Sequence, residues 1–209
     1  MLRLSNGVTI HQFGEPRLFI VAGSHGDEKA PVIAIESILT KKLKNDVWII
    51  SCLNKQGFAD ENRFYSGIKT RDGLQENFNL NREYRARTKL KFMKELQDII
   101  KEYKPEIFLD MHEHIAEDTA NDFIWSSLDN KNEAVESNLR EFCRQHKVGI
   151  IYQPLTKEYR DSSDFFARRF GSLNAYSTET YKYNPIKRRV SMNKKFVRFF
   201  LKMIIEENK

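Results

Sequence analysis

The sequence predicts an α/β fold with a largely parallel β-sheet that helices cover on both faces. Short apolar runs alternate along the chain with segments of helical periodicity, which is typical of such folds. The 209 residues suffice to bury a core without disulfides or structural metals. Because no Pro-, Gly- or Ser-rich or low-complexity stretch divides the chain, we expect a single domain over residues 1–209.

Five apolar runs have the length and composition of strands. In chain order, the expected strands are residues 17–22, 47–53, 106–110, 149–152 and 175–178. Shorter β elements between Gly7 and Phe13 are expected to form an antiparallel edge.

Segments with helical spacing of apolar residues separate these runs. The expected helices are residues 29–43, 88–103, 131–146 and 162–170, with a last helix after Pro185. The apolar face expected for the last helix consists of Val190, Phe196, Val197, Phe200 and Leu201. This face is expected to lie on the core, so the basic residues of the same segment face solvent.

Two irregular stretches interrupt the alternation, at residues 54–87 and 113–122. Long loops within compact domains are usually functional or mobile. Both stretches begin where a predicted strand ends. Since ligands of open α/β sheets bind beyond the carboxyl ends of the strands, we expect the chemistry there.

Composition bears on partners and location. The formal net charge is +6, but no nucleic-acid-binding motif accompanies the basic residues, which argues against a nucleic-acid partner. No apolar run is long enough to span a bilayer and no secretory signal is visible, so we expect a cytoplasmic protein without a membrane anchor. Cys52 and Cys143 are expected to be buried reduced thiols. The oligomeric state is left open.

A first group of possible metal ligands follows the strand that ends at Ala22. The turn Gly23-Ser24-His25-Gly26-Asp27-Glu28 places a histidine and a glutamate three residues apart. Imidazole nitrogens and carboxylates are good zinc donors, and Gly26 lets the backbone bend so that both can converge. A glutamate in a first helical turn also stabilises the helix by itself.

A second group, Asp110-Met111-His112-Glu113-His114, follows another predicted strand. Two histidines and one glutamate form an established set of catalytic zinc ligands, and His25, Glu28 and His112 supply it. His114 competes with His112, because residues two apart in an extended segment share a face. Asp110, on that face too, can orient a ligating imidazole through its second nitrogen.

Several polar residues are candidates for contact with a substrate. Asn81 and Arg82 can clamp a carboxylate, since a guanidinium binds it with two parallel hydrogen bonds. Arg63 and Arg71 precede them, and an arginine beside the metal can instead polarise a scissile carbonyl. Glu179 ends the last predicted strand, where it could accept a proton and return it to a leaving amine.

Taken together, these segments resemble the zinc carboxypeptidase superfamily, in its succinylglutamate desuccinylase and aspartoacylase branch. Residues 23–28 are similar to the GxHGxE motif of that branch, and Asn79-Leu80-Asn81-Arg82 is similar to its DLNR motif. Asp110-Met111-His112 resembles its DLH segment, and Thr178-Glu179-Thr180 resembles the segment of its late catalytic glutamate. Four similar pieces occur in the same order, from Gly23 to Thr180.

The resemblance implies a three-layer α/β/α sandwich around a mixed, mostly parallel sheet of eight strands. It implies one zinc ion per chain on His25, Glu28 and His112, with Glu179 as general base and then acid. It further implies that Asn81 and Arg82 grip a substrate carboxylate. Arg63 resembles the arginine that polarises the carbonyl, with Arg71 as the alternative.

The expected function is zinc-dependent hydrolysis of an amide or peptide bond next to a carboxylate-bearing group, in a peptide or another small molecule. Asn79 replaces the first aspartate of DLNR. The residues after Thr180 are too few for the C-terminal β domain usual in the deacylase branch, so both carboxypeptidase-like and N-acyl amino acid deacylase-like substrates stay open. The alternative is a catalytically inactive zinc- or peptide-binding member of the same fold.

Overall fold

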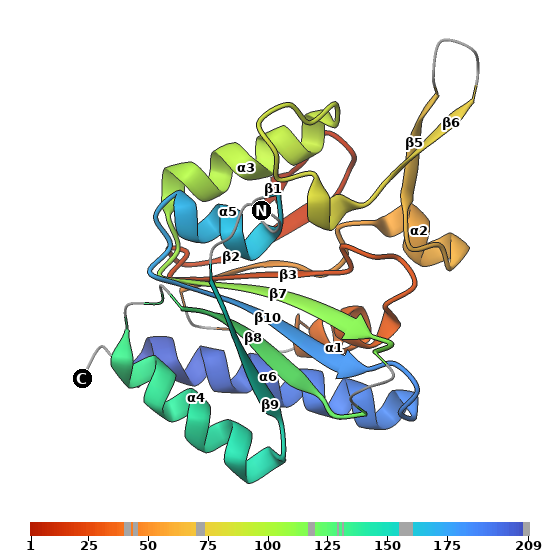
Figure 1. The fold of residues 1–209 in the computed structure, drawn as a ribbon. Coiled ribbons are helices and arrows are strands. Elements are labelled where there is room, and N and C mark those ends of the chain that lie inside the picture. Colours follow the sequence, from red (N-terminus) through yellow and green to blue (C-terminus); the bar gives the residue numbers. More distant parts are fainter. Residues whose placement is uncertain are drawn as a thin grey trace.

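An eight-stranded β-sheet forms the middle layer of the molecule (Figure 1). The computed structural model describes residues 1–39, 43, 46–69, 74–116, 120–128, 130, 132–154 and 161–206. The strands lie in the order β1 (Leu2–Arg3), β2 (Thr9–Phe13), β4 (Val47–Ile50), β3 (Leu18–Ala22), β7 (Ile107–His114), β10 (Asn174–Tyr181), β8 (Phe123–Ser127) and β9 (Gly149–Gln153). The pairs β1–β2, β2–β4 and β8–β10 are antiparallel, and the other neighbours are parallel. The sheet is mixed and mostly parallel, which confirms the predicted fold class.

Helices cover both faces of the sheet (Figure 1). One face carries α1 (Lys29–Leu39), α4 (Glu133–His146) and α6 (Ile186–Glu206), and the other carries α3 (Lys91–Tyr103) and α5 (Ser163–Arg169). The molecule therefore has the three α/β/α layers that the resemblance implies.

The central strand β3 shows why this sequence forms a covered sheet. All five of its residues are buried. Leu18, Ile20 and Ala22 belong to the apolar cluster beneath α1, α4 and α6, whereas Phe19 and Val21 belong to the cluster beneath α3 and α5. Because successive side chains of a strand point to opposite faces, only a strand that is apolar throughout can face two helical layers.

The predicted elements agree with the structure in type, and their bounds differ. All five expected strands and all five expected helices are present, and β2 forms the antiparallel edge on β4. Strand β7 continues to His114 and β10 continues to Tyr181, so 113 and 114 are strand residues and not part of an irregular stretch. Strand β8 is absent from the prediction, because its apolar run, Phe123-Ile124-Trp125, is only three residues long.

The stretch 54–87 is more regular than predicted. It contains the short helix α2 (Lys55–Asp60), the antiparallel strands β5 (Tyr65–Lys69) and β6 (Gln75–Phe78), and the 3-10 turn η1 (Leu80–Arg82). The β5–β6 hairpin projects from the body of the molecule (Figure 1). Its base and η1 lie near the carboxyl ends of the central strands, where the chemistry is expected.

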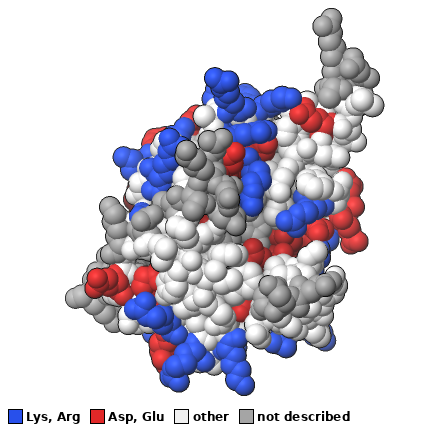
Figure 2. Space-filling model, in the orientation of Figure 1, with Lys and Arg blue, Asp and Glu red and all other residues white. Residues whose placement is uncertain are grey.

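On the face shown in Figure 2, basic side chains are spread over several parts of the surface with acidic ones among them. Along the described residues, no helix combines the length and the hydropathy that crossing a bilayer requires.

Candidate metal centre and active site

The turn after β3 brings His25 and Glu28 to the carboxyl edge of the sheet. It starts at Gly23, whose φ of +67° lies in the left-handed region that favours glycine. At Gly26, a Cβ atom would lie 2.1 Å from the carbonyl carbon of Gly57, so only glycine fits against α2 here. The Gly26 amide also donates a hydrogen bond of 3.3 Å to the carbonyl of Arg63. The turn and the segment that carries Arg63 are thereby held together.

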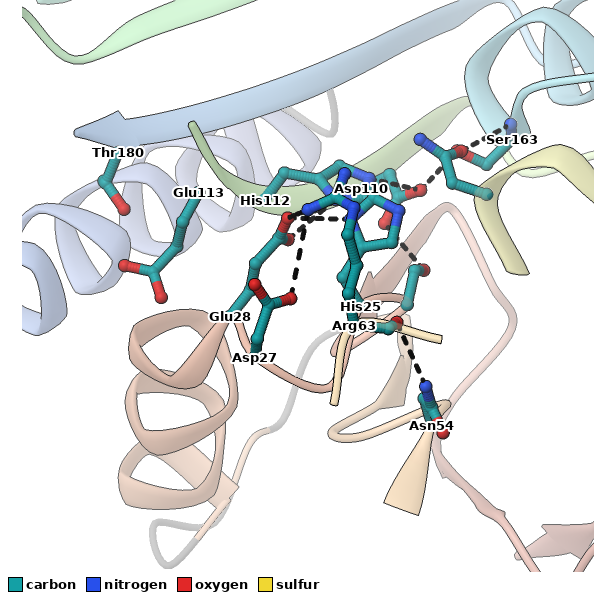
Figure 3. Close-up of polar contacts among 12 residues, drawn as sticks. His25, Asp27, Glu28, Asn54, Arg63, Asp110, His112, Glu113, Ser163 and Thr180 are labelled. Carbon is teal, nitrogen blue, oxygen red and sulfur yellow. Dashed lines mark hydrogen bonds and ion pairs between the residues drawn. The ribbon is translucent and has the colours of Figure 1, made fainter. Parts of the chain in front are cut away.

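The imidazoles of His25 and His112 converge on the carboxylate of Glu28 (Figure 3). Its Oε1 atom lies 2.7 Å from Nδ1 of His25, and its Oε2 atom lies 2.9 Å from Nδ1 of His112. One ligand atom from each of the three residues lies within 4.8 Å of the others, and all three residues are buried. The structure thus brings together the three metal ligands predicted from the sequence.

The remaining nitrogen of each imidazole faces a different oxygen. Nε2 of His25 lies 2.9 Å from the amide oxygen of Asn79, and Nε2 of His112 lies 3.0 Å from Oδ2 of Asp110. Asp110 is fully buried and also accepts a hydrogen bond from the hydroxyl of Ser163. These contacts leave Nδ1 of both rings directed at Glu28, the arrangement in which two imidazoles can bind one ion while outer partners orient them.

The charges of this cluster suit a divalent cation. Burial opposes ionisation of Glu28, but the imidazoles of His112 and His25 outweigh it and lower the pKa of the carboxyl. Burial likewise opposes protonation of His112, but Asp110 and Glu28 outweigh it and raise the pKa of the ring. Two buried carboxylates therefore favour positive charge between them, and the two-histidine, one-glutamate donor set fits zinc.

Arg63 lies at the rim of this cluster. Its guanidinium is 3.0 Å from Oε1 of Glu28 and 3.9 Å from Oδ1 of Asp27, and 43% of its side chain is exposed. Asp27 also forms an ion pair with Lys182, which follows β10. Arg63, one of the residues predicted to contact a substrate, therefore lies beside the ligand cluster. Arg71, the alternative, lies outside the described residues.

Glu179 reaches the cluster from the neighbouring strand. In the parallel pairing of β7 and β10, its partner in register is His112. Its Oε2 atom is buried and has no hydrogen-bond partner among the described residues. Burial raises the pKa of this carboxyl to about 8, and the carboxylates of Glu28 and Asp110 contribute in the same direction, against the attraction of His112. An acid with this pKa and a free oxygen suits proton transfer near neutral pH.

All these groups line one cavity of about 400 Å³. Asn81 and Arg82, both in η1, line it as well, so the structure brings the predicted carboxylate clamp to the same cavity. Asn81 accepts a hydrogen bond from the backbone amide of Ser163 with its Oδ1 atom, which leaves its amide nitrogen as a donor. His114 lines the cavity too, but its Nε2 atom lies 3.0 Å from the carbonyl of Asn121 and it is not part of the ligand cluster.

The family model of the succinylglutamate desuccinylase/aspartoacylase catalytic domain matches residues 14–176, which is most of the chain. The chain belongs to this family. Membership indicates a hydrolase that acts on amide or peptide bonds, in agreement with the motifs found in the sequence. Comparison with curated proteins by sequence found no match.

Solved structures confirm the fold of this family member. A candidate metallopeptidase from Shewanella denitrificans OS217 superposes with a TM-score of 0.73 at 20% identity, over 94% of this chain and 79% of its own. A second candidate metallopeptidase, from Shewanella baltica OS155, superposes with a TM-score of 0.68 at 18% identity, over 94% of this chain and 81% of its own. The cell shape determinant protein Csd4 from Helicobacter pylori superposes with a TM-score of 0.72 at 17% identity. The match covers 94% of this chain but only 54% of Csd4.

Two contacts of the site escaped the sequence reasoning. The Asn79 amide is in contact with His25, although the sequence offered only its place in a motif. Ser163 bridges Asp110 and Asn81, yet in the sequence it is one serine near the start of a predicted helix. Both join segments distant in sequence, and no local pattern reports such a contact.

Proposed function

We propose that this chain is a zinc-dependent hydrolase of amide or peptide bonds that lie next to a carboxylate-bearing group. The observation that carries the proposal is the convergence of both imidazole Nδ1 atoms on Glu28, in a cavity that also contains Arg63 and Glu179. A cluster that served only the fold would have no need of an acid with an unpartnered oxygen and a raised pKa beside it.

Different residues of the chain bind the substrate, stabilise the developing negative charge and transfer the proton. Arg82 and the amide of Asn81 bind the substrate carboxylate and so orient the neighbouring scissile carbonyl toward the ligand cluster. Arg63 donates hydrogen bonds to the carbonyl oxygen as that oxygen gains negative charge. Glu179 removes a proton from the attacking water molecule and later delivers it to the leaving nitrogen.

Zinc would be held by His25, Glu28 and His112, and when bound it supplies a Lewis acid that polarises a carbonyl and acidifies water. Asn79 and Asp110 hold the two imidazoles in the orientation that presents Nδ1. Arg63 contacts Glu28 in this structure and lines the same cavity, so its guanidinium lies beside the residues that would hold the ion.

Two substrate classes agree with the carboxylate clamp. One is a peptide with a free C-terminal carboxylate, and the other is an N-acyl amino acid. Among the similar structures, Csd4 is described as a D,L-carboxypeptidase and has been solved with a tripeptide and with mDAP. A panel that contains short peptides and N-acetyl and N-succinyl amino acids separates the two classes.

Metal analysis of the purified protein tests the centre. We expect about one zinc per chain after zinc is offered at neutral pH, and loss of it in His25→Ala. His114→Ala is the matched control, because this histidine lines the same cavity outside the ligand cluster and its variant should keep zinc. A native protein that takes up no zinc would refute the proposal.

The Glu179→Gln variant tests the proton-transfer role. Because general acid–base catalysis contributes roughly 10²- to 10⁴-fold, turnover should fall by at least about 100-fold while zinc stays bound. Full activity in this variant would exclude Glu179 as the base. A native protein that binds zinc but cleaves no member of the panel would instead favour the inactive binding protein.

A further inference from the structure

A second, smaller cavity adjoins the one that contains the ligand cluster. Its volume is about 160 Å³, and three of its lining residues, Asn81, Arg82 and Glu179, also line the larger cavity. The proposed carboxylate clamp therefore stands between the two. A substrate held there, with its scissile carbonyl toward His25 and His112, directs the side chain of its carboxylate-bearing residue into the second cavity.

Besides Glu179, one further acidic residue is among the described residues that line this second cavity. Asp164, in the first turn of α5, lines it, and one carboxylate oxygen accepts a hydrogen bond from the hydroxyl of Ser162. Asp164 makes no ion pair with any other described residue. Its charge is thus available to a ligand.

The rest of the lining has a consistent character. Trp125 provides an apolar surface, and the oxygen atoms of Gln153 and Ser177 provide hydrogen-bond acceptors. Arg82 is the only basic residue among the described residues that line this cavity. Once a substrate carboxylate neutralises Arg82, the carboxylate of Asp164 is the charge that remains, because the raised pKa of Glu179 keeps that carboxyl largely protonated near neutral pH. A neutral side chain would leave Asp164 without a partner, and an acidic one would be repelled.

We propose that this second cavity selects a cationic side chain, an alkylammonium or a guanidinium, on the substrate residue that carries the carboxylate. This inference rests on the proposed function and adds a substrate class to it. The methylene groups of such a side chain pack on Trp125, as long basic side chains do on apolar surfaces. The charged end pairs with Asp164 in a charge-assisted hydrogen bond.

Matched substrates test the inference. The panel contains N-acylated dipeptides and N-acyl amino acids whose carboxylate-bearing residue is lysine, norleucine or glutamate, in both L and D forms. Norleucine has the same number of side-chain carbons as lysine but lacks the ammonium. We expect kcat/KM for lysine to exceed that for norleucine about tenfold or more, with glutamate lowest.

Substitution of Asp164 tests whether this residue causes the preference for lysine over norleucine. In Asp164→Asn, the hydrogen bond from Ser162 keeps an acceptor, so the fold should be unaffected. The preference for lysine over norleucine should disappear, because kcat/KM for lysine falls toward that for norleucine. Asp98→Asn removes a carboxylate from the exposed side of α3, away from both cavities, and should keep the preference. If Asp164→Asn retains the preference, the inference is wrong.

A binding experiment separates this inference from the proposed function. Free lysine and free norleucine are titrated calorimetrically into native protein and Asp164→Asn. Tighter binding of lysine to native protein alone supports the cationic pocket even if no substrate is cleaved, which would refute only the proposed hydrolysis. Cleavage without any preference for lysine would overturn the pocket and leave hydrolysis standing. Equal binding of both amino acids, with no cleavage, would overturn both.

Discussion

Replacing Asp110 by asparagine is expected to weaken zinc binding about tenfold without unfolding the protein. Asp110 is fully buried, and its Oδ2 atom lies 3.0 Å from Nε2 of His112. Asparagine has the same shape and keeps one oxygen, so Ser163 still has an acceptor for its hydroxyl. The substitution removes only the negative charge of Asp110. That charge orients the His112 ring and makes its other nitrogen a stronger metal ligand.

The expected magnitude follows from the difference between charged and neutral partners. A hydrogen bond to a charged group contributes roughly 1.5–3 kcal/mol, and a neutral one roughly 0.5–1.5 kcal/mol. The loss is therefore about 1–1.5 kcal/mol, which corresponds to about a tenfold larger dissociation constant. It falls at the lower end of the roughly 10- to 100-fold losses that changes in outer metal partners cause.

Competition with a chromophoric chelator measures the zinc dissociation constant of both proteins, and circular dichroism checks that the variant is folded. Asp122→Asn is the matched control. Asp122 is also a buried aspartate, but it accepts a hydrogen bond from the backbone of Tyr181, so its substitution should leave zinc affinity unchanged. A folded Asp110→Asn protein with native zinc affinity would refute the role assigned to Asp110.

Three other predictions concern the turn, the acid and the thiols. Gly26→Ala should abolish zinc uptake, because its Cβ would collide with the backbone of Gly57, and native zinc content would contradict this. In metal-free protein, Glu179 ionises in the unfolded chain near its ordinary pKa of 4.5 but in the folded chain only near a pKa of about 8. The free energy of unfolding should therefore decrease as the pH rises from about 5 to about 8, and it should decrease less in Glu179→Gln. Urea unfolding at each pH measures this free energy, and the same decrease in both proteins would exclude the effect. Burial raises the pKa of Cys52 to about 11 and that of Cys143 to about 12. Neither thiol should therefore react with a disulfide reagent at pH 8 until the protein unfolds. Rapid labelling of the native protein would contradict this prediction.

Most of the chemistry that the sequence predicts for the site lies at the ends of strands. His25, His112 and Glu179 each lie at or near the carboxyl end of an apolar run, and in a parallel sheet those ends share one edge. Spacing of two residues within a strand also places Asp110 on the same face as His112. Fold class, the order of the five expected strands and five expected helices, and the ligand cluster could thus be predicted from local patterns.

The parts that could not be predicted depend on contacts between distant segments. The hydrogen bond of Asn79 with His25 requires the stretch 54–87 to fold back over the sheet, and nothing in its composition specifies that path. Asp164 lines the same cavity as Arg82 because of how α5 packs against β10. Strand β8 is too short for its own periodicity to reveal it, and it forms because β10 and β9 offer partners on both sides.

The register of β7 and β10 separates what is fixed in this protein from what can vary. His112 and Glu179 are neighbours in two central strands whose backbones are hydrogen-bonded to each other, and a slip by one residue would turn one of them to the opposite layer. Arg63, Asn81 and Arg82 instead come from the stretch between β4 and α3. Changes of length or sequence in that stretch can alter which molecules are accepted without moving the pair in the sheet. The register of the sheet thus keeps His112 beside Glu179 whatever changes occur in the stretch that carries the proposed carboxylate clamp.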